Sequence, residues 1–260
     1  MKYNSSRKFV VLLVFVALLS FNVNAQDKAT ENLRVLFVGN SYTYFWNLPQ
    51  TVETLASSKE KTIVCRKSTA GGMSLKQHWD GERELKSREL IKNGDWDYVV
   101  LQNHSMSAIE NSEEFMEYGK KFIDLIQESG AKPILYMTWA RKFNPLMQEA
   151  ITNAYTQLGE ETGTKVAPVG EAWKRVRELR PDLELFAKDE SHPSPEGTYL
   201  AACVFFKTLT GEEVKGLSGR VKIIDKNGEE LFLSIISNED AGFLQAVADE
   251  VVGVFEFIEK

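Results

Sequence analysis

The sequence predicts a three-layer α/β/α sandwich built on a parallel sheet of about five strands. Short apolar runs of strand length recur along the chain, and longer segments with helical spacing separate them. Buried parallel strands read as continuous apolar runs, and their alternation with helices favours helical layers on both faces of the sheet. A length of 260 residues is sufficient for one well-buried domain and short for two.

The strands and helices are expected in strict alternation. The predicted strands are residues 34–39, 62–67, 97–102, 132–138 and 164–169, and the predicted helices are residues 48–60, 74–93, 111–129 and 144–161. In the third helix, apolar residues recur at spacings of three and four, which is typical of a helix with one apolar face. These residues are Phe115, Tyr118, Phe122, Leu125 and Ile126.

The C-terminal third is expected to begin with one more helix. Ser194 is a good N-cap, and Pro195 suits the first helical position. Beyond residue 219 the pattern is weaker: Lys226-Asn227-Gly228 favours a hairpin, and a helix is expected near residues 240–258.

The extreme N-terminus has the three parts of a secretory signal peptide. A positive region, an apolar region and a small-residue cleavage site follow one another at residues 2–8, 9–21 and 23–25. The apolar run is short for a bilayer span, and no cysteine follows the cleavage site to carry a lipid. We therefore expect residues 1–25 to be removed, and residues 26–260 to form one secreted or periplasmic domain with no membrane anchor.

Charge and composition disfavour several classes of function. Removal of the leader takes away three positive charges and no acidic residue, which moves the net charge from −6 to −9. An acidic exported domain is a poor candidate for binding nucleic acid. Cys65 and Cys203 lie in apolar runs and are expected to be buried free thiols, although export would permit a disulfide. The sequence contains neither common metal-ligand spacings nor a phosphate-binding loop, so no cofactor or metal is expected.

A serine stands at the abrupt end of the first expected strand. Taken alone, Gly39-Asn40-Ser41 predicts only a turn. In open parallel sheets, however, ligands bind at the carboxyl ends of strands, near the point where the strand order reverses. Ser41 follows the first strand at that edge, Gly71-Gly72 follow the second, and Asn103 follows the third. These loops are therefore expected to meet over one edge of the sheet.

A serine nucleophile needs a histidine base that a carboxylate orients. His78 and His104 have no acidic residue placed to orient them in their motifs. His192 follows Asp189 by three residues, and a compact turn of that length brings the two side chains to one side. Asp-x-x-His alone is common in capped turns, so the prediction depends on its occurrence together with Ser41 and the loops described above.

In order and spacing, these segments resemble the conserved blocks of the GDSL-type, or SGNH, hydrolases over nearly the whole mature chain. The resemblance implies a flavodoxin-like parallel sheet and the SGNH hydrolase fold. It also implies that Ser41 is the nucleophile and that Asp189 and His192 complete the catalytic machinery. Gly72, with Gly71 as the close alternative, would supply a backbone N–H to the oxyanion, and Asn103 in "VVLQNHS" would supply a side-chain amide.

The sequence departs from the family pattern at two places. Asn40 stands where the family has aspartate, a change that leaves the nucleophile in place. The third block reads Leu-Gln-Asn-His rather than Gly-x-Asn-Asp, so the amide donor is Gln102 or Asn103, of which we favour Asn103. Neighbouring residues at a strand end point in opposite directions, so Gln102 and Asn103 cannot both reach one oxyanion unless the chain bends. Thr43 rules out the Gly-x-Ser-x-Gly elbow of α/β-hydrolases.

The resemblance implies hydrolysis of carboxylic esters through an acyl-enzyme. Export and the aromatic residues near the expected cleft favour O-acetyl groups on carbohydrate, in a small-molecule or polysaccharide ester. We expect substrate contacts from Gln102, His104 and Trp139. The alternatives are a lipid or aryl-ester esterase of the same family, a non-catalytic carbohydrate-binding protein on this scaffold, and a flavodoxin-like anion binder. The last of these would leave Asp189 and His192 unexplained.

Overall fold

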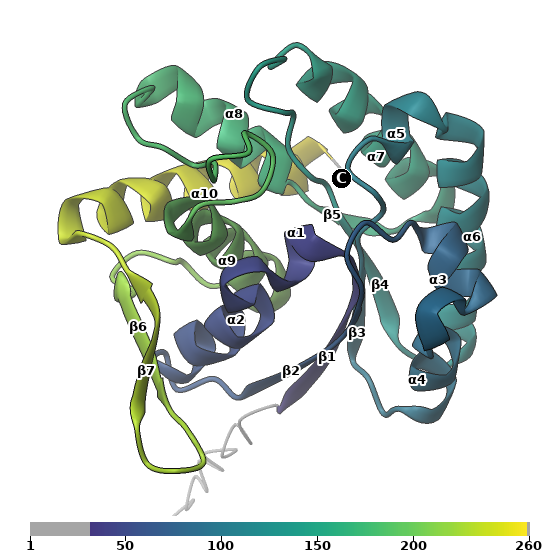
Figure 1. The fold of residues 1–260 in the computed structure, drawn as a ribbon, viewed down its shortest axis with the longest axis horizontal. Helices are drawn as coiled ribbons and strands as arrows, with labels where there is room; N and C mark the ends of the chain where they lie inside the picture. Colours follow the sequence, from purple (N-terminus) through teal and green to yellow (C-terminus); the bar gives the residue numbers. More distant parts are fainter. Residues whose placement is uncertain (1–31, 259–260) are drawn as a thin grey trace, which may run out of the picture.

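Five parallel strands form the central sheet, in the order β2-β1-β3-β4-β5 (Figure 1). The computed structural model describes residues 32–258, so the predicted signal peptide lies outside the described residues. The strands are β1 (Leu33–Gly39), β2 (Ile63–Thr69), β3 (Tyr98–Leu101), β4 (Lys132–Tyr136) and β5 (Lys165–Ala167). This is the flavodoxin-like order, and its direction reverses between β1 and β3. The predicted α/β/α fold class is confirmed.

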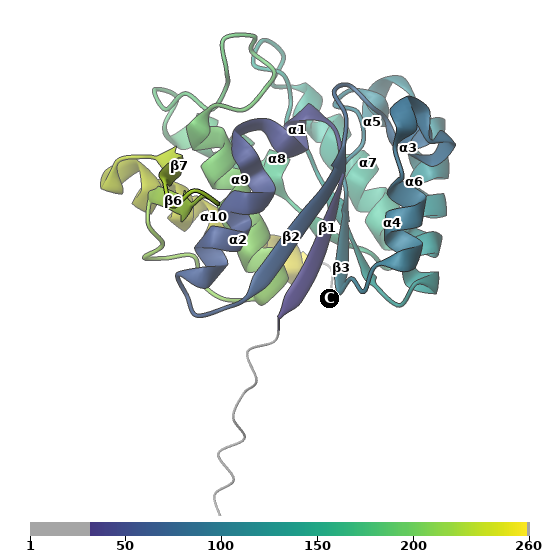
Figure 2. The same ribbon diagram turned by 60° about the horizontal axis from the view of Figure 1, so that its bottom comes forward.

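Helices cover both faces of the sheet (Figure 2). One layer contains α2 (Leu48–Ser57), α8 (Val169–Leu179), α9 (Pro195–Thr210) and α10 (Asn238–Ile258). The other contains α3 (Leu75–Asp80), α4 (Ser87–Asn93), α6 (Ser112–Glu128) and α7 (Met147–Thr162). Two short helices, α1 (Ser41–Tyr44) and α5 (Ser107–Glu110), lie beyond the carboxyl ends of β1 and β3.

The central strand β1 divides its side chains between two hydrophobic cores. Val35 and Phe37 pack into the core beneath α2, α8, α9 and α10. Leu36 and Val38 pack into the core beneath α3, α4, α6 and α7. Because successive side chains of a strand point to opposite faces, an unbroken apolar run is what a strand buried on both faces requires.

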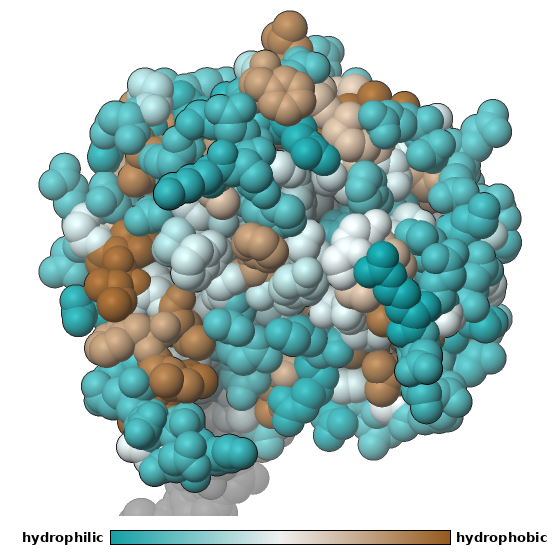
Figure 3. Space-filling model, viewed as in Figure 1, coloured by the Kyte–Doolittle hydropathy of each residue, from teal (hydrophilic) through white to brown (hydrophobic). Residues whose placement is uncertain are grey.

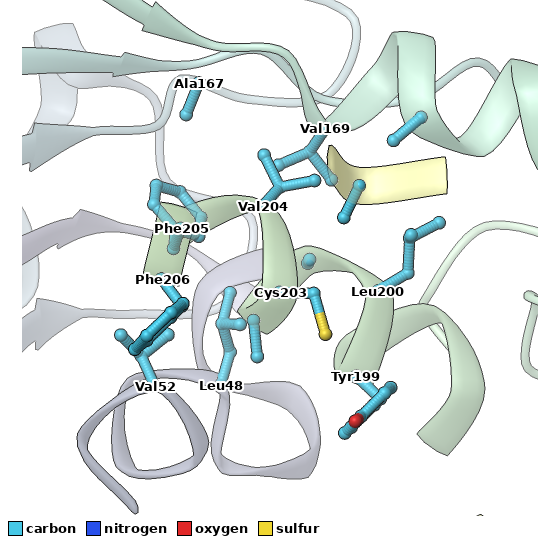
Figure 4. Close-up of a cluster of buried hydrophobic side chains, with 14 of the residues drawn as sticks. Leu48, Val52, Ala167, Val169, Tyr199, Leu200, Cys203, Val204, Phe205 and Phe206 are labelled. Carbon is cyan, nitrogen blue, oxygen red and sulfur yellow. The ribbon is translucent and has the colours of Figure 1, made fainter. Parts of the chain in front are cut away.

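Helix α9 is buried between the sheet and its neighbouring helices. Figure 4 shows its Phe206 beside Val52 of α2 and its Val204 beside Val169 of α8, while the ring of Phe205 packs edge-to-face on Phe37 of β1 and Tyr136 of β4. A helix that is apolar around its circumference needs such cover. As predicted, its N-terminus has Ser194 as the cap and proline in the first turn, with the Ser194 hydroxyl accepting from the N–H of Gly197 at 3.1 Å. Cys65 and Cys203 are buried free thiols, as expected.

The expected helix over residues 74–93 is divided. Ser74 and Gln77 form a capping box at the start of α3, and Gly81 ends that helix with a φ of +74°. This left-handed conformation favours glycine. A 3₁₀ turn, Glu82–Glu84, then leads to α4.

Helix α8 was not predicted, and the expected strand over residues 164–169 overlaps its first residue. The strand ends at Ala167, and α8 begins at Val169. A signal for the helix was nevertheless available. Its buried apolar residues, Val169, Ala172, Trp173 and Val176, recur at spacings of three and four.

The C-terminal tail forms the predicted hairpin and helix. Strands β6 (Arg220–Ile224) and β7 (Glu230–Ile235) pair antiparallel, and α10 packs against α8 and α9. Apolar side chains gather on the surface over this hairpin (Figure 3). Those exposed are Ile224, Leu231, Phe232 and Ile235. Among residues 32–258, no helix has both the length and the apolar character to cross a membrane.

A buried histidine links the second helical layer to the end of β1. One ring nitrogen of His78, Nε2, lies 2.9 Å from the carbonyl oxygen of Gly39, and Nδ1 lies 2.7 Å from the hydroxyl of Ser87. A neutral ring satisfies both partners when Nε2–H donates and Nδ1 accepts. Burial lowers the pKa of His78 to about 4, although the hydrogen bond to Gly39 opposes the shift.

We predict that His78 makes the fold sensitive to acid. An unfolded chain takes up the proton near the ordinary pKa of 6.5, whereas the folded protein resists it down to about 4. Between these values the unfolded state binds more protons, so the free energy of unfolding falls as the pH falls, by about 3 kcal/mol from this group. The measurement is urea unfolding at pH 7 and pH 4 for the wild type and His78→Gln. The variant should be less stable at pH 7 and lose less stability on acidification. Equal losses in the two proteins would contradict the prediction.

Candidate active site

The nucleophile candidate occupies the first position of the short helix that follows β1. Asn40 caps this helix, because its Oδ1 accepts from the N–H of Tyr42 at 3.1 Å. Gly39 is needed just before the cap, since a Cβ there would lie 2.5 Å from Oε1 of Gln102. Helix starts leave N–H groups without helical acceptors, so the N–H of Ser41 is available to a ligand.

Ser41, His192 and Asp189 lie together, as the sequence predicted. Oγ of Ser41 is 2.8 Å from Nε2 of His192, and Nδ1 of the same ring is hydrogen-bonded to Oδ2 of Asp189. The other carboxylate oxygen of Asp189 accepts from the N–H groups of Ser191 at 3.1 Å and His192 at 3.0 Å. The turn of three residues therefore brings acid and base to one side.

The charge on Asp189 fixes the orientation of the His192 ring. Partial burial acts to raise the pKa of Asp189, but the hydrogen bonds from His192 and from two backbone N–H groups outweigh it and hold that pKa below its ordinary value. An ionised carboxylate can only accept, so Nδ1 of His192 carries the proton that the two groups share. Nε2 is then free to accept the proton of the Ser41 hydroxyl.

Asn103 is oriented as an amide donor. Its Oδ1 accepts from the N–H of Leu75 at 3.0 Å and from the N–H of His104 at 2.7 Å. These two bonds fix the amide plane and leave Nδ2 as the group that can donate to a substrate. This geometry favours Asn103 over Gln102 as the donor.

The glycine pair lies in the turn between β2 and α3. Gly72 has a φ of +71°, in the region that favours glycine, whereas Gly71 does not. The turn is anchored to the helix cap, because Nδ2 of Asn40 donates to the carbonyl oxygen of Met73 at 3.0 Å. Both glycines therefore lie in a loop that is tied directly to the residue before Ser41.

The predicted substrate contact of Gln102 is wrong. The side chain is 0% exposed, and its whole amide is used inside the protein. Oε1 accepts from the N–H of Asn40 at 2.8 Å and from the hydroxyl of Thr43 at 3.0 Å, and Nε2 donates to the carbonyl oxygen of Asn103. Gln102 therefore positions the neighbouring loops and does not touch a ligand.

The predicted substrate contact of Trp139 stays a prediction, and the structure gives this side chain a structural role. Its ring is 2% exposed and is stacked between Tyr42, at 4.5 Å between ring centroids, and Trp173, at 3.9 Å. Its indole N–H donates to the carbonyl oxygen of Ser191 at 3.0 Å. The hydroxyl of Tyr42 also meets the hydroxyl of Ser191, at 2.6 Å. Trp139 and Tyr42 thus hold the turn that carries His192.

Two aromatic residues beside His192 were not predicted as its neighbours. The ring of Phe45 stacks on the imidazole of His192, with centroids 4.2 Å apart and planes 15° apart. Trp46 is 48% exposed, and its indole N–H donates to the carbonyl oxygen of Pro193 at 2.9 Å. The available signal was the position of Phe45, four residues after Ser41 and therefore one helical turn beyond it.

His104 lies at the same edge of the sheet, next to Asn103. The ring is half-buried, and its Nδ1 accepts from the N–H of Met106 at 3.3 Å. Burial lowers the pKa of His104, and the positive charge of Arg141 lowers it further. The contact of His104 with a substrate stays a prediction. Within residues 32–258, no group of three or more His, Cys, Asp or Glu side chains could hold a metal ion.

Several solved structures share this fold. A protein from Slackia heliotrinireducens assigned to the SGNH hydrolases is 27% identical, with a TM-score of 0.59, over 68% of this chain and 98% of its own. A DUF4886 family protein from Bacteroides uniformis is 19% identical, with a TM-score of 0.67, over 88% of this chain and 96% of its own. An acetyl xylan esterase is 13% identical, with a TM-score of 0.56, over 68% of this chain and 100% of its own.

The other two comparisons found no relative. No protein-family model matches the chain, and no curated protein is significantly similar to it. The likenesses to the DUF4886 protein and the acetyl xylan esterase concern the fold alone, because both proteins are less than 25% identical to this chain. The strand order, the hydrogen bonds that join Ser41 to His192 and His192 to Asp189, and the solved SGNH hydrolase structure make this chain similar to the GDSL-type, or SGNH-type, hydrolases.

Proposed function

We propose that the chain is a serine esterase that removes O-acyl groups, foremost O-acetyl groups, from carbohydrate through an acyl-enzyme on Ser41. The observation that carries the proposal is the distance of 2.8 Å between Oγ of Ser41 and Nε2 of His192, a ring that Asp189 orients through its other nitrogen. Secretion or periplasmic localisation stays a prediction of the N-terminal sequence.

In the acylation step, Ser41 attacks the carbonyl carbon of the ester. His192 accepts the serine proton at Nε2 and then donates it to the oxygen of the leaving alcohol. Asp189 stabilises the imidazolium that forms between these transfers. Water then attacks the acyl-serine, again with His192 as base, and Ser41 is regenerated with release of the carboxylic acid.

Negative charge on the carbonyl oxygen develops in both steps. The donors proposed for it are the N–H of Ser41, the N–H of Gly72 and Nδ2 of Asn103. Such donors stabilise the transition state more than the ester itself, because they are fixed before the charge appears.

Two observations support a carbohydrate ester as the substrate. Trp46 is exposed beside the segment that carries His192, where the leaving alcohol must lie to receive its proton. An aromatic ring in that position can pack against the apolar face of a sugar. One of the proteins with the same fold is an acetyl xylan esterase.

A lipid ester is the second candidate. The loop after β4 exposes Phe143 at 73% and Leu146 at 85%. This loop touches the turn from Asp189 to His192, here called the catalytic turn, because the N–H of Lys142 donates to the carbonyl oxygen of Glu190 at 3.0 Å. Exposed apolar side chains at the rim of the site could bind a long acyl chain.

We predict that Ser41→Ala abolishes ester hydrolysis. Turnover of p-nitrophenyl acetate should fall by about a thousandfold or more, because the variant cannot form the acyl-enzyme. A matched control is Ser57→Ala, which changes an exposed serine at the end of α2. Equal turnover in the Ser41 variant, or none in the wild type with any ester, would contradict the proposal.

The choice of ester separates the two substrate classes in the same assay. For a carbohydrate acetyl esterase, we expect acetate release from acetylated xylan together with a preference for p-nitrophenyl acetate over the longer p-nitrophenyl acyl esters. A rate that rises with chain length, without release from xylan, would favour the lipid candidate.

We predict that Asn103→Asp lowers kcat by about 100- to 1000-fold with little loss of folding stability, because an oxyanion donor is removed. The aspartate can still accept from the N–H groups of Leu75 and His104 but cannot donate when ionised. Gln102→Ala, by contrast, should lower the free energy of unfolding by about 1–3 kcal/mol, since it leaves buried polar groups unpaired. Kinetics and urea unfolding of both variants test this. A small kinetic effect of Asn103→Asp would argue against its role as donor.

We predict that Tyr42→Phe lowers kcat/KM by about tenfold without unfolding the protein. The variant should position His192 less well but leave its acid–base chemistry intact. The variant keeps the ring that stacks on Trp139 and loses the hydroxyl that meets Ser191. Ser191→Ala should have a similar effect, and the double variant should be no worse than either single one. Additive effects of the two changes would show that the two hydroxyls act independently.

A further inference from the structure

Arg141 lies at the edge of the sheet where the active site is built, in the loop that follows β4. Its Nη2 donates to the hydroxyl of Ser105 at 3.1 Å, two residues beyond Asn103. The next residue, Lys142, donates its N–H to the carbonyl oxygen of Glu190, two residues before His192. Arg141 is therefore attached on one side to the loop of the amide donor and on the other to the catalytic turn.

The positive charge of Arg141 acts on groups of the site. It adds to burial in lowering the pKa of the neighbouring His104. Burial raises the pKa of Tyr42, and the hydrogen bond to Ser191 and the charge of Arg141 oppose that shift. The guanidinium thus lies close to two side chains that immediately follow Ser41 and Asn103 in the sequence.

No carboxylate of the described residues lies within ion-pair distance of Arg141. The acidic residue of the catalytic turn, Asp189, is used by His192 and by two backbone N–H groups. The next cation along the chain, Lys142, is paired with Glu184. Arg141 is half-buried, and one hydrogen bond to Ser105 uses only one of its five N–H donors.

From this arrangement we infer that Arg141 binds a carboxylate of the substrate, so that the ester is carried by an acidic sugar such as a uronic acid. The inference rests on the proposed esterase function of the same site. A guanidinium presents two parallel N–H donors that match a carboxylate, and the pair is stronger where water is partly excluded. His192 must protonate the leaving alcohol, and the loop of Arg141 is bonded to the turn of His192, so the carboxylate is expected on the alcohol part.

The net negative charge of the protein is consistent with this single contact. A chain with a net charge of −6 repels long polyanions in general. A local cation at the cleft would then select one carboxylate next to the scissile ester rather than bind acidic polymers over a wide surface.

The test compares two matched substrates, a mono-O-acetylated methyl glucuronoside and the corresponding methyl glucoside. They differ only in whether the sugar carries a carboxylate or a hydroxymethyl group. The wild type should prefer the acidic sugar in kcat/KM, and Arg141→Gln should lower this preference by about 10- to 100-fold, as expected for loss of a charged hydrogen bond. Arg141→Lys keeps the charge without the paired donors, so it should retain part of the preference. Arg175→Gln, which changes a half-buried arginine on α8, is the matched control.

Three results would overturn the inference. The first is a wild type with no preference between the sugars. The second is an Arg141→Gln variant that loses activity equally on both, since Arg141 would then only hold the Ser105 loop. The third is an equal loss of preference in Arg175→Gln.

A binding measurement separates this inference from the proposed function. Calorimetric titration of the Ser41→Ala protein with the two sugars needs no turnover. In one outcome, the Ser41→Ala protein binds the glucuronoside more tightly than the glucoside, Ser41→Ala/Arg141→Gln does not, and the wild type hydrolyses neither sugar. That outcome would support the carboxylate site and overturn the proposed esterase function. If the wild type hydrolyses both acetylated sugars and the Ser41→Ala protein binds the two equally well, the esterase function would be supported and the carboxylate site overturned.

Discussion

The active-site edge of this protein depends on one buried amide, the side chain of Gln102. It accepts from Asn40 and Thr43 and donates to the backbone of Asn103, so it joins the ends of β1 and β3 at the point where the strand order reverses. The close contact leaves no space for a side chain at Gly39. Because an unpaired buried polar group is costly, this fully satisfied amide strongly favours one arrangement of the two strand ends. Ser41 and the Asn103 side chain are presented from that arrangement.

The acid and base reach Ser41 from a segment far away in the sequence, and aromatic packing fixes their position. The rings of Tyr42, Trp139 and Trp173 form one continuous stack. The hydroxyl of Tyr42 and the indole N–H of Trp139 both bond to Ser191, the residue before His192. The stack therefore attaches the turn to the helix of the nucleophile and to α8. Catalytic geometry of this kind needs support from rigid elements, because small displacements cost much of the rate.

The sequence was sufficient for the sheet and for most helices, because these follow from apolar runs and from helical spacing. The grouping of Ser41 with His192, and of His192 with Asp189, was expected from strand-end placement together with the resemblance to the SGNH hydrolases. The sequence was not sufficient for Gln102 and Trp139. The direction of Gln102 is set by hydrogen-bond partners about sixty residues away, the N-cap Asn40 of α1 and Thr43 within that helix. The burial of Trp139 depends on Trp173, which lies on the helix that the sequence analysis missed. Local patterns locate strand ends, whereas side-chain exposure at those ends depends on contacts between distant segments.

The departure from the family pattern at Asn40 has a physical reason in the same network. Asparagine and aspartate cap helices equally well, but only asparagine can accept and donate at once. Here Oδ1 accepts from Tyr42 while Nδ2 donates to Met73, which couples the glycine turn to the nucleophile. A carboxylate would face the Met73 carbonyl without a proton to share. The three loops are thus joined by the neutral amides of Asn40, Gln102 and Asn103. Neutral amides bring no negative charge to the place where the proposed oxyanion forms, and this favours the proposed ester hydrolysis.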